Sequence, residues 1–165
     1  MTSPDGGSAR RVFLSLGSNQ GDRRRFLAEA VESLGPMVTA VSSVFETDPV
    51  GGPQQGLFLN LVVELRSTLT PRELLAVCHR LESGAGRVRT ERWGPRTLDV
   101  DVLWIDGETV ADDDLEIPHP RMWERRFVLA PLRELAPDLV GEDQVIAAVG
   151  AVRVVDGLPP SPGSR

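Results

Sequence analysis

The order of strand-like and helix-like segments over the first hundred residues is the strongest constraint on how this 165-residue chain can fold. Runs of apolar and β-branched residues predict strands over residues 12–16, 38–45, 57–65 and 98–105. Apolar residues at helical spacing, after Asp22 and after Thr70-Pro71, predict helices over residues 22–34 and 70–82. This β-α-β-β-α-β order is typical of the ferredoxin-like, split βαβ arrangement. We therefore expect an α+β protein in which an antiparallel sheet carries helices mainly on one face and the active site on the other.

The remaining residues predict short elements and loose ends. Asp106-Gly107 predicts a turn before a short strand over residues 108–110, and helices are expected near residues 120–124, 128–135 and 143–149. Pro, Gly and Ser are frequent at both termini and are poor material for a core. We expect a flexible N-terminal tail over residues 1–10, a single catalytic domain over 11–150 and a loose C-terminal tail over 151–165.

Composition excludes several classes of protein. A net charge of -6 is not that of a general nucleic-acid binder. Cys78 is the only cysteine, so this chain can build neither a disulfide nor a cysteine-based zinc site by itself. The first ten residues lack the apolar stretch of a signal peptide, and no run reaches the 18 or so apolar residues of a membrane span. The sequence favours a cytoplasmic protein with small-molecule partners.

Two acids one residue apart form the first chemical signal. Side chains alternate between the faces of a strand, so Asp99 and Asp101 are expected on one face, with Val100, Val102 and Trp104 on the opposite, helix-covered face. The Cα atoms of the two acids would lie about 6.6 Å apart along the strand, and two carboxylates this close repel each other unless a positive group lies between them. Magnesium is typically bound by one or two carboxylates together with substrate phosphates. The alternative is a solvated strand face whose acids pair with nearby arginines.

Basic residues gather directly before this acidic pair. Four arginines fall within ten residues, at Arg87, Arg89, Arg92 and Arg96. The planar guanidinium group binds phosphate oxygens in pairs and keeps its charge at any relevant pH. A loop of this kind could close over a triphosphate, although a mobile, solvent-exposed basic loop is the alternative.

The segment RWGPRTLDVDVL, residues 92–103, resembles the signature of the 6-hydroxymethyl-7,8-dihydropterin pyrophosphokinase family. Three further segments resemble that family in the same order: LSLGSN at 14–19, FETDPVG at 45–51 with FLN at 58–60, and IPHPR at 117–121 with RRFVL at 125–129. The resemblance covers roughly residues 11–140. It implies a magnesium-dependent enzyme of folate biosynthesis that transfers the β,γ-pyrophosphoryl group of ATP to the hydroxymethyl group of the pterin and releases AMP.

The resemblance also implies roles for individual residues. Asp99 and Asp101 would hold two magnesium ions and, with Arg87 and Arg96, form the catalytic set. Residues expected to bind ATP are Glu82, Arg87, Arg89, Arg92, Arg96, Val102, His119 and Arg125. Residues expected to bind the pterin are Thr47, Val50, Phe58, Asn60, Trp93, Asp99 and Phe127.

Some of these roles have competing interpretations. Phe58 and Phe127 could be core residues, which is the commoner place for phenylalanine. Asn60, between two leucines on a strand, is harder to place in a core because a buried amide needs partners. His119 could hold a turn between two prolines, and His79 on the second helix is interpreted as structural.

Two other functions remain open at this stage. One is a metal-dependent phosphohydrolase, which would use the same acids with water as the nucleophile. The other is a non-catalytic ferredoxin-like module that binds a small ligand. We expect a monomer with no nucleic-acid or membrane partner.

Overall fold

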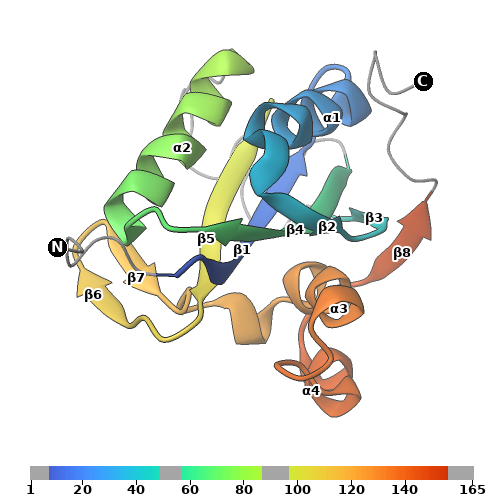
Figure 1. Ribbon diagram of the computed structural model, residues 1–165. Coiled ribbons are helices and arrows are strands. Elements are labelled where there is room, and N and C mark those ends of the chain that lie inside the picture. Colours follow the sequence, from blue (N-terminus) through green and yellow to red (C-terminus); the bar gives the residue numbers. More distant parts are fainter. Residues whose placement is uncertain (1–7, 49–56, 87–96, 156–165) are drawn as a thin grey trace, which may run out of the picture.

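The computed structural model describes residues 8–48, 57–86 and 97–155, and within these ranges an antiparallel sheet forms the centre of the fold (Figure 1). Its strands are β1 (Arg10–Ser18), β2 (Val38–Val41), β3 (Val44–Thr47), β4 (Phe58–Ser67), β5 (Asp99–Ile105) and β8 (Val152–Val155). The order across the sheet is β5-β1-β4-β3-β8, and β2 also pairs with β4. A separate hairpin consists of β6 (Val110–Asp112) and β7 (Leu115–Ile117). The expected antiparallel sheet is confirmed, and β5 lies at one of its edges.

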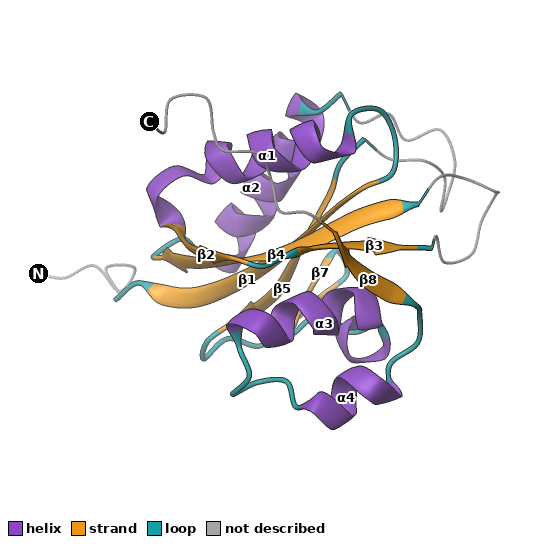
Figure 2. Ribbon diagram, turned by 90° about the vertical axis from the view of Figure 1, so that its right-hand side faces the viewer, coloured by secondary structure: helices purple, strands orange, loops and turns teal. Residues whose placement is uncertain are grey.

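Helices cover both faces of the sheet, with α1 and α2 on one side and α3 and α4 on the other (Figure 2). Their bounds are α1 (Arg23–Leu34), α2 (Pro71–Gly84), α3 (Arg126–Leu135) and α4 (Glu142–Ala147). The expectation of helices mainly on one face was therefore wrong. Phe13 and Val62 make the second face apolar, and α3 buries them through Leu129 and Leu132.

Both predicted helix starts are confirmed in detail. The Asp22 carboxylate accepts a hydrogen bond from Arg25 N at 3.2 Å. Thr70 and Glu73 form a reciprocal capping box, in which each side chain accepts from the other residue's backbone N–H. Helix α1 ends at Gly35, whose φ of 61° lies in the left-handed region.

The predicted strand over residues 38–45 is interrupted at Ser42. Its hydroxyl accepts from Val62 N at 2.9 Å and donates to Ser43 O at 2.8 Å. A side chain that bonds to the neighbouring strand replaces a ladder contact and divides the segment into β2 and β3. Both short strands still pair with β4.

Strand β5 contains an extra residue that interrupts the alternation of its side chains. Val102 pairs with Leu14 and Trp104 pairs with Phe13, which leaves Leu103 as the extra residue of a bulge. Leu103 and Trp104 consequently both pack in the cluster beneath α3. The expectation that Trp104 shares a face with Val102 was wrong, because alternation restarts after the bulge.

The C-terminal boundary also differs from expectation. Val152–Val155 form β8, which pairs with β3 along its whole length. Arg153 on β8 also forms an ion pair with Glu46 on β3. The expectation of a loose tail from residue 151 was wrong for these four residues, because β3 has a free edge that they complete. At the other end, β1 begins at Arg10 rather than after the predicted N-terminal tail.

The shorter elements lie close to their predicted positions, but their lengths differ from the prediction. The turn at Asp106-Gly107 is present, with Gly107 at a φ of 76°. The strand expected at residues 108–110 begins only at Val110, and its partner β7 was not predicted. The helix expected at 120–124 is a single 3₁₀ turn, Met122–Glu124, while α3 and α4 lie close to their predicted positions.

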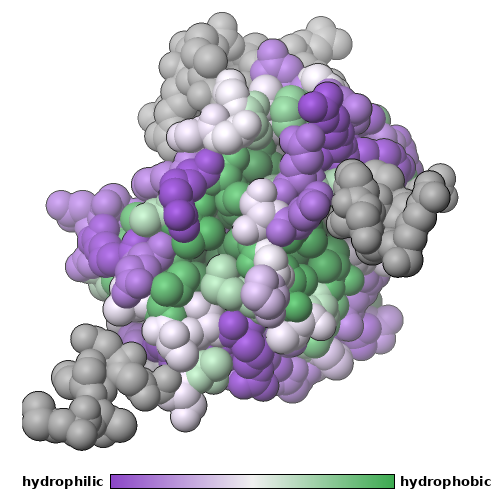
Figure 3. All heavy atoms as spheres, turned by 45° about the horizontal axis from the view of Figure 1, so that its top comes forward, coloured by the Kyte–Doolittle hydropathy of each residue, from purple (hydrophilic) through white to green (hydrophobic). Residues whose placement is uncertain are grey.

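Two apolar clusters stabilise the fold, one on each face of the sheet. Leu14, Leu61 and Val102 pack against α1 and α2 in the first, and Phe13 and Val62 pack beneath α3 in the second. Figure 3 shows one face of the molecule on which hydrophobic residues gather at the centre and hydrophilic residues surround them. In the described part of the chain, no helix is both long and apolar enough to cross a membrane.

Candidate active site

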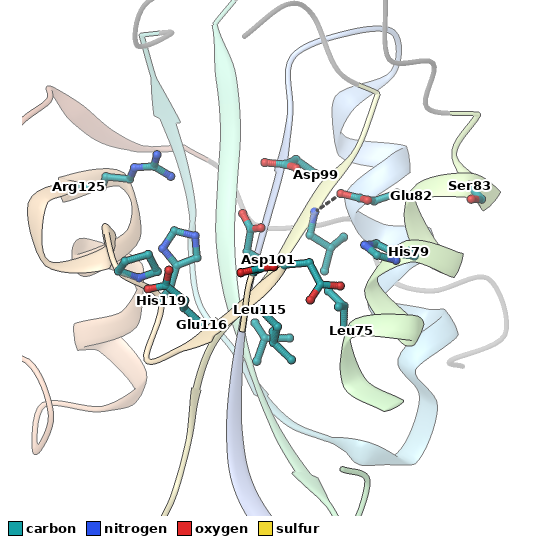
Figure 4. Close-up of a pocket in the computed structure, with 15 residues that line it drawn as sticks. Leu75, His79, Glu82, Ser83, Asp99, Asp101, Leu115, Glu116, His119 and Arg125 are labelled. Carbon is teal, nitrogen blue, oxygen red and sulfur yellow. Dashed lines mark hydrogen bonds between the residues drawn. The ribbon is translucent and has the colours of Figure 1, made fainter. Parts of the chain in front are cut away.

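A cleft of about 800 Å³ runs along the outer edge of β5 (Figure 4). Helix α2 forms one wall, the β6–β7 hairpin forms another, and the segment around His119 and Arg125 lies opposite α2. This volume suits a ligand of the size of a nucleotide. The residues that line it are Leu75, His79, Glu82, Ser83, Asp99, Val100, Asp101, Val102, Asp113, Asp114, Leu115, Glu116, His119, Pro120 and Arg125.

The acidic pair lies in this cleft as the strand pattern predicts. Asp99 and Asp101 are half-buried, whereas Val100 and Val102 between and after them are buried in the core beneath α1 and α2. The two carboxylates therefore share one face of β5. Within the described residues β5 pairs only with β1, so its outer edge borders the cleft together with the face that carries the acids.

Glu82 closes part of the exposed edge of β5. It is only 6% exposed, and its carboxylate accepts a hydrogen bond from Val100 N at 3.0 Å. Backbone groups two residues apart on a strand point the same way, so the peptide groups of Val102 also face this edge. Further along, His119 N donates to Leu103 O at 2.9 Å and attaches the His119 segment to the strand.

His119 and Arg125 bring a hydrogen-bond donor and a cation to the acids. Burial lowers the pKa of His119 below its ordinary value, Arg125 and Arg121 act in the same direction, and Asp99 opposes them. The imidazole is consequently neutral at pH 7. Its Nδ1 accepts from Arg121 N at 3.2 Å, so the ring proton belongs on Nε2. His119 is thereby a neutral donor within the cleft.

Among the described residues that line the cleft, Arg125 is the one whose side chain best suits the binding of a phosphate. Burial lowers the pKa of its guanidinium group, while the carboxylates of Asp101 and Asp99 oppose that shift. A guanidinium group stays protonated at neutral pH despite such a shift. Its central carbon also lies 5.6 Å from the centre of the Phe127 ring, which places Phe127 beside the cleft.

On two walls of the cleft, sequence reasoning predicted only Glu82 of α2 and none of the hairpin residues. Leu75, His79 and Glu82 recur at helical spacing on α2 and all line it, so the interpretation of His79 as purely structural does not describe its position. That spacing was the available signal. The hairpin wall carries Asp113 and Asp114, and nothing in the sequence indicated that these acids would line the same cleft as Asp99.

An arginine joins these two walls. Arg72, in the first turn of α2, donates to both carboxylate oxygens of Asp114 and to Asp112, with all three distances at 2.8 Å. One guanidinium nitrogen serves Asp114 and the other serves Asp112, and together they keep the β6–β7 hairpin beside α2, although all three side chains are more than half exposed. We refer to Arg72, Asp112 and Asp114 as the hairpin clamp.

A second group of predicted residues lies on the same sheet face, two strands from Asp99. Asn60 Nδ2 donates to Thr47 Oγ1 at 2.9 Å, and the two residues are 8% and 5% exposed. Thr47 pairs with the half-buried Phe58 across β3 and β4. The expected need of Asn60 for a partner is therefore met by Thr47. Asn60 and Asp99 both pair with Gly17 of β1, from opposite sides, which places them about 10 Å apart across two strand spacings.

Several predicted site residues lie outside the described residues. They are Val50, Arg87, Arg89, Arg92, Trp93 and Arg96. The described residues thus contain the acidic pair, Glu82, Val102, His119, Arg125, Thr47, Phe58, Asn60 and Phe127.

The described residues suit a hard divalent cation only with help from a substrate. Asp99 and Asp101 supply carboxylate oxygens on one strand face. No group of three or more His, Cys, Asp or Glu residues within the described ranges could enclose a metal ion. Magnesium commonly takes this incomplete protein contribution and fills the rest of its shell with phosphate oxygens and water. The donor set therefore fits a metal–nucleotide complex.

Comparison with known proteins shows which family this sequence matches. Residues 13–137 match the sequence profile of the family described as 7,8-dihydro-6-hydroxymethylpterin-pyrophosphokinase. A 2-amino-4-hydroxy-6-hydroxymethyldihydropteridine pyrophosphokinase of Bacillus subtilis is 47% identical over 135 residues, which cover 79% of this chain and 81% of that protein. The protein of the same name from Methylorubrum extorquens is 49% identical over 134 residues, covering 79% and 85%.

Solved structures show the same fold at low sequence identity. The HPPK-DHPS protein of Plasmodium falciparum aligns with a TM-score of 0.57 and 14% identity over 76% of this chain. The chain spans 41% of the length of that protein.

Proposed function

Because this chain belongs to the 7,8-dihydro-6-hydroxymethylpterin-pyrophosphokinase family, we propose that its cleft transfers the β,γ-pyrophosphoryl group of ATP to 6-hydroxymethyl-7,8-dihydropterin in folate biosynthesis. In this reaction the hydroxymethyl oxygen bonds to the β-phosphorus of ATP. The bond from that phosphorus to the oxygen bridging to the α-phosphate breaks, and AMP leaves with the bridging oxygen. The protein is thus a diphosphokinase with two small-molecule substrates.

The observation that carries this proposal is the row of facing residues across three strands. Asp99, Gly17 and Asn60 lie in register on β5, β1 and β4, on one face of the sheet. At one end of the row is an acidic cleft large enough for a nucleotide, and at the other is a buried amide suited to a heterocycle. Two substrates bound there would meet above β1.

Asp99 and Asp101 are the residues that would hold magnesium, and we propose two ions. Bound to the triphosphate, the metal would supply charge neutralisation where negative charge grows during transfer. Without it, the two half-buried carboxylates would repel the phosphates, which supports the assignment.

The phosphates of ATP are proposed to meet His119 and Arg125 on the wall opposite α2. His119 donates from Nε2 without adding charge, and Arg125 contributes a partly desolvated cation. Glu82 and the edge peptides of Val102 face the same cleft from the side of β5 and α2. We further propose Arg87, Arg89, Arg92 and Arg96 as phosphate ligands, because Arg92 and Arg96 belong to the family-like segment 92–103 and the other two precede it closely in sequence.

The pterin is proposed to lie against Asn60 with its ring between aromatic side chains. Asn60 offers an acceptor and a donor to the polar edge of the ring, and Phe58 and Phe127 approach from β4 and α3. Thr47 contributes to this end of the site, and Val50 and Trp93 complete the proposed set. Asp99 is proposed to contact both substrates, because it lines the cleft and also lies in register with Asn60 across β1.

The fold proposed for this enzyme is the ferredoxin-like, split βαβ arrangement within a single domain. The order β5-β1-β4-β3 and the two helices α1 and α2 on one face support it. Because one chain supplies every described wall of the cleft, we propose that a monomer is active.

The direct test is to incubate the purified protein with ATP and Mg²⁺, with and without 6-hydroxymethyl-7,8-dihydropterin. AMP and pterin pyrophosphate in equal amounts, formed only when the pterin is present, would support the proposal. Inorganic phosphate formed without pterin would instead indicate a hydrolase. Absence of turnover with both substrates bound would indicate a binding module and refute the enzyme.

A further inference from the structure

Gly17 lies at the centre of the row that joins the two proposed substrate regions. It pairs with Asn60 of β4 on one side and with Asp99 of β5 on the other. A Cβ atom at this position would lie 2.7 Å from Asn60 Oδ1 and 3.7 Å from a ring carbon of Phe58. The carboxamide oxygen of Asn60 therefore already occupies the space that a side chain would take, while Phe58 lies at ordinary contact distance.

The requirement at Gly17 is for space and not for an unusual backbone conformation. Gly21, Gly35 and Gly107 have φ angles between 61° and 76°, a region that side chains disfavour, whereas Gly17 is in a regular strand. An alanine at Gly17 could keep the strand and its pairing. The contact it would make is with the tip of a flexible side chain, so Asn60 would rotate away while the sheet stayed intact.

The carboxamide of Asn60 is held from both sides. Its nitrogen donates to Thr47 Oγ1 on the β3 side, and its oxygen lies over Gly17 on the β1 side, toward Asp99. A Cα–H group beneath the amide tolerates an oxygen better than an NH₂ group, which favours this orientation. Rotation of the amide would break the bond to Thr47 at a site where both residues are buried.

We propose that Gly17 is a positioning residue for the pterin: the absence of its side chain lets Asn60 lie across β1 with its oxygen toward the reaction centre. This inference rests on the proposed function, and it adds a residue that touches no reacting atom. Thr47 serves the same purpose through its hydroxyl group. The amide is thereby fixed before the substrate arrives, which lowers the cost of ordering it on binding.

The test is a double-mutant cycle of Gly17→Ala and Asn60→Ala, with KM measured separately for pterin and ATP. We expect Gly17→Ala to raise KM for the pterin by about tenfold, the size of one well-placed hydrogen bond, and to change KM for ATP less than twofold. In the Asn60→Ala background the same substitution should raise KM for the pterin less than twofold, because its effect acts through Asn60. Fully additive effects, or equal increases for both substrates, would overturn the proposal.

Two further variants keep the result interpretable. Gly141→Ala is the matched control, because Gly141 lies on the far α4 side with a φ of -83° and its nearest neighbour 3.8 Å from an added Cβ. It should leave both KM values unchanged. If Gly17→Ala does not fold, Thr47→Val removes the hydrogen bond at constant volume and should raise KM for the pterin in an Asn60-dependent way. An inactive wild-type protein would refute the proposed function itself, whereas an active wild type with an unaffected Gly17→Ala variant would refute only this inference.

Discussion

Asp99 and Asp101 differ from the exposed acids Asp112–Asp114 because both are half-buried on one face of an edge strand. Neighbouring groups reinforce this difference. Cys78 lies behind the strand, and burial raises the pKa of its thiol, with Asp101, Glu82 and Asp99 adding to that effect. A neutral thiol leaves the carboxylates as the anionic ligands at this position.

We expect Asp101→Ala to lower turnover at least ~10²-fold, because it removes a proposed metal ligand rather than core volume. The unfolding midpoint should change little, since Asp101 is half-exposed. Steady-state kinetics and urea denaturation measure the two quantities. Asp143→Ala, an exposed acid on α4, is the control. Turnover close to that of the wild type would argue against the metal assignment.

Stability should depend on pH through His119. Burial lowers its pKa in the folded state below the ordinary value of 6.5, so the unfolded state binds the proton more readily. The folded protein therefore loses stability as pH falls through about 6.5, and the effect is absent above about pH 7.5, where both states are neutral.

The variant His119→Asn tests this pH dependence, because an Asn oxygen can accept from Arg121 N but does not titrate. Urea unfolding between pH 5.5 and 7.5 should show a smaller loss of stability in the variant than in the wild type. His79 is present in both proteins and cancels. Identical pH profiles would show that the folded and unfolded pKa values of His119 are the same.

At the scale of elements, the β6–β7 hairpin forms a wall of the cleft without belonging to the main sheet. Leu115 and Ile117 attach it to the core, and the hairpin clamp attaches its tip to α2. Exposed ion pairs of this kind are screened by salt. The width of the cleft should accordingly depend on a contact remote from the chemistry.

We expect Arg72→Ala to raise KM for ATP about two- to fivefold, the range for exposed charge pairs, with kcat changed less than twofold. High salt should raise KM for ATP in the wild type more than in the variant, because the clamp is already absent there. Arg25→Ala, which removes an exposed ion pair with Glu29 on α1, is the matched control. An unchanged KM for ATP would show that the clamp does not shape the cleft.

The elements that could be predicted from sequence are those with local signals. Asp22 and the Thr70 capping box predict where their helices begin. The alternation of acidic and apolar residues from Asp99 to Val102 predicts that both acids lie on one face of the strand. The bulge at Leu103 and the break at Ser42 depend on contacts with β1 and β4, so no local pattern reveals them. Likewise His79 and Asp114 line the same cleft only because α2 and the hairpin pack together.

At the scale of the whole molecule, β8 closes the sheet at the end opposite β5. Its residues pair with Val44–Thr47, and Glu46 receives both Arg153 and, at 3.8 Å, Arg23 of α1. Arg23 also donates to Leu57 O at 2.7 Å, directly before Phe58. The C-terminal strand therefore supports the strands that carry the proposed pterin contacts.

A chain that ends at Ala151 should be less stable than one that ends at Val155, by about 1–3 kcal/mol, because it loses the β3 pairing and the Glu46 contact. Truncation should also raise KM for the pterin more than it raises KM for ATP, because Thr47 pairs with Val152 of β8. Urea denaturation and steady-state kinetics of the two chains measure these effects. Equal unfolding midpoints would mean that β8 contributes nothing to the sheet.

The order of the predicted elements was sufficient for the sheet, and the four matching segments were sufficient for the family, but neither indicated that a second helical layer covers the other face of the sheet (Figure 2). That layer covers Phe13 and Val62, which lie side by side on the second face once β1 pairs with β4. In the sequence alone they look like any other core residues. The pairing of strands that are distant in sequence decides which face an apolar side chain occupies, and this pairing is difficult to predict from a single sequence.

The extra residue at Leu103 adds a buried side chain to one short strand without changing the facing of the residues around it. Asp99 and Asp101 line the cleft upstream of it, Leu103 and Trp104 both pack beneath α3, and Ile105 returns to the cluster beneath α1 and α2. A chain without Leu103 would keep the pairs Leu14–Val102 and Phe13–Trp104 in ordinary alternation, with the acids and Trp104 on the same faces as before. The bulge therefore fills the interior beneath α3 and leaves the orientation of the acids in the cleft unchanged.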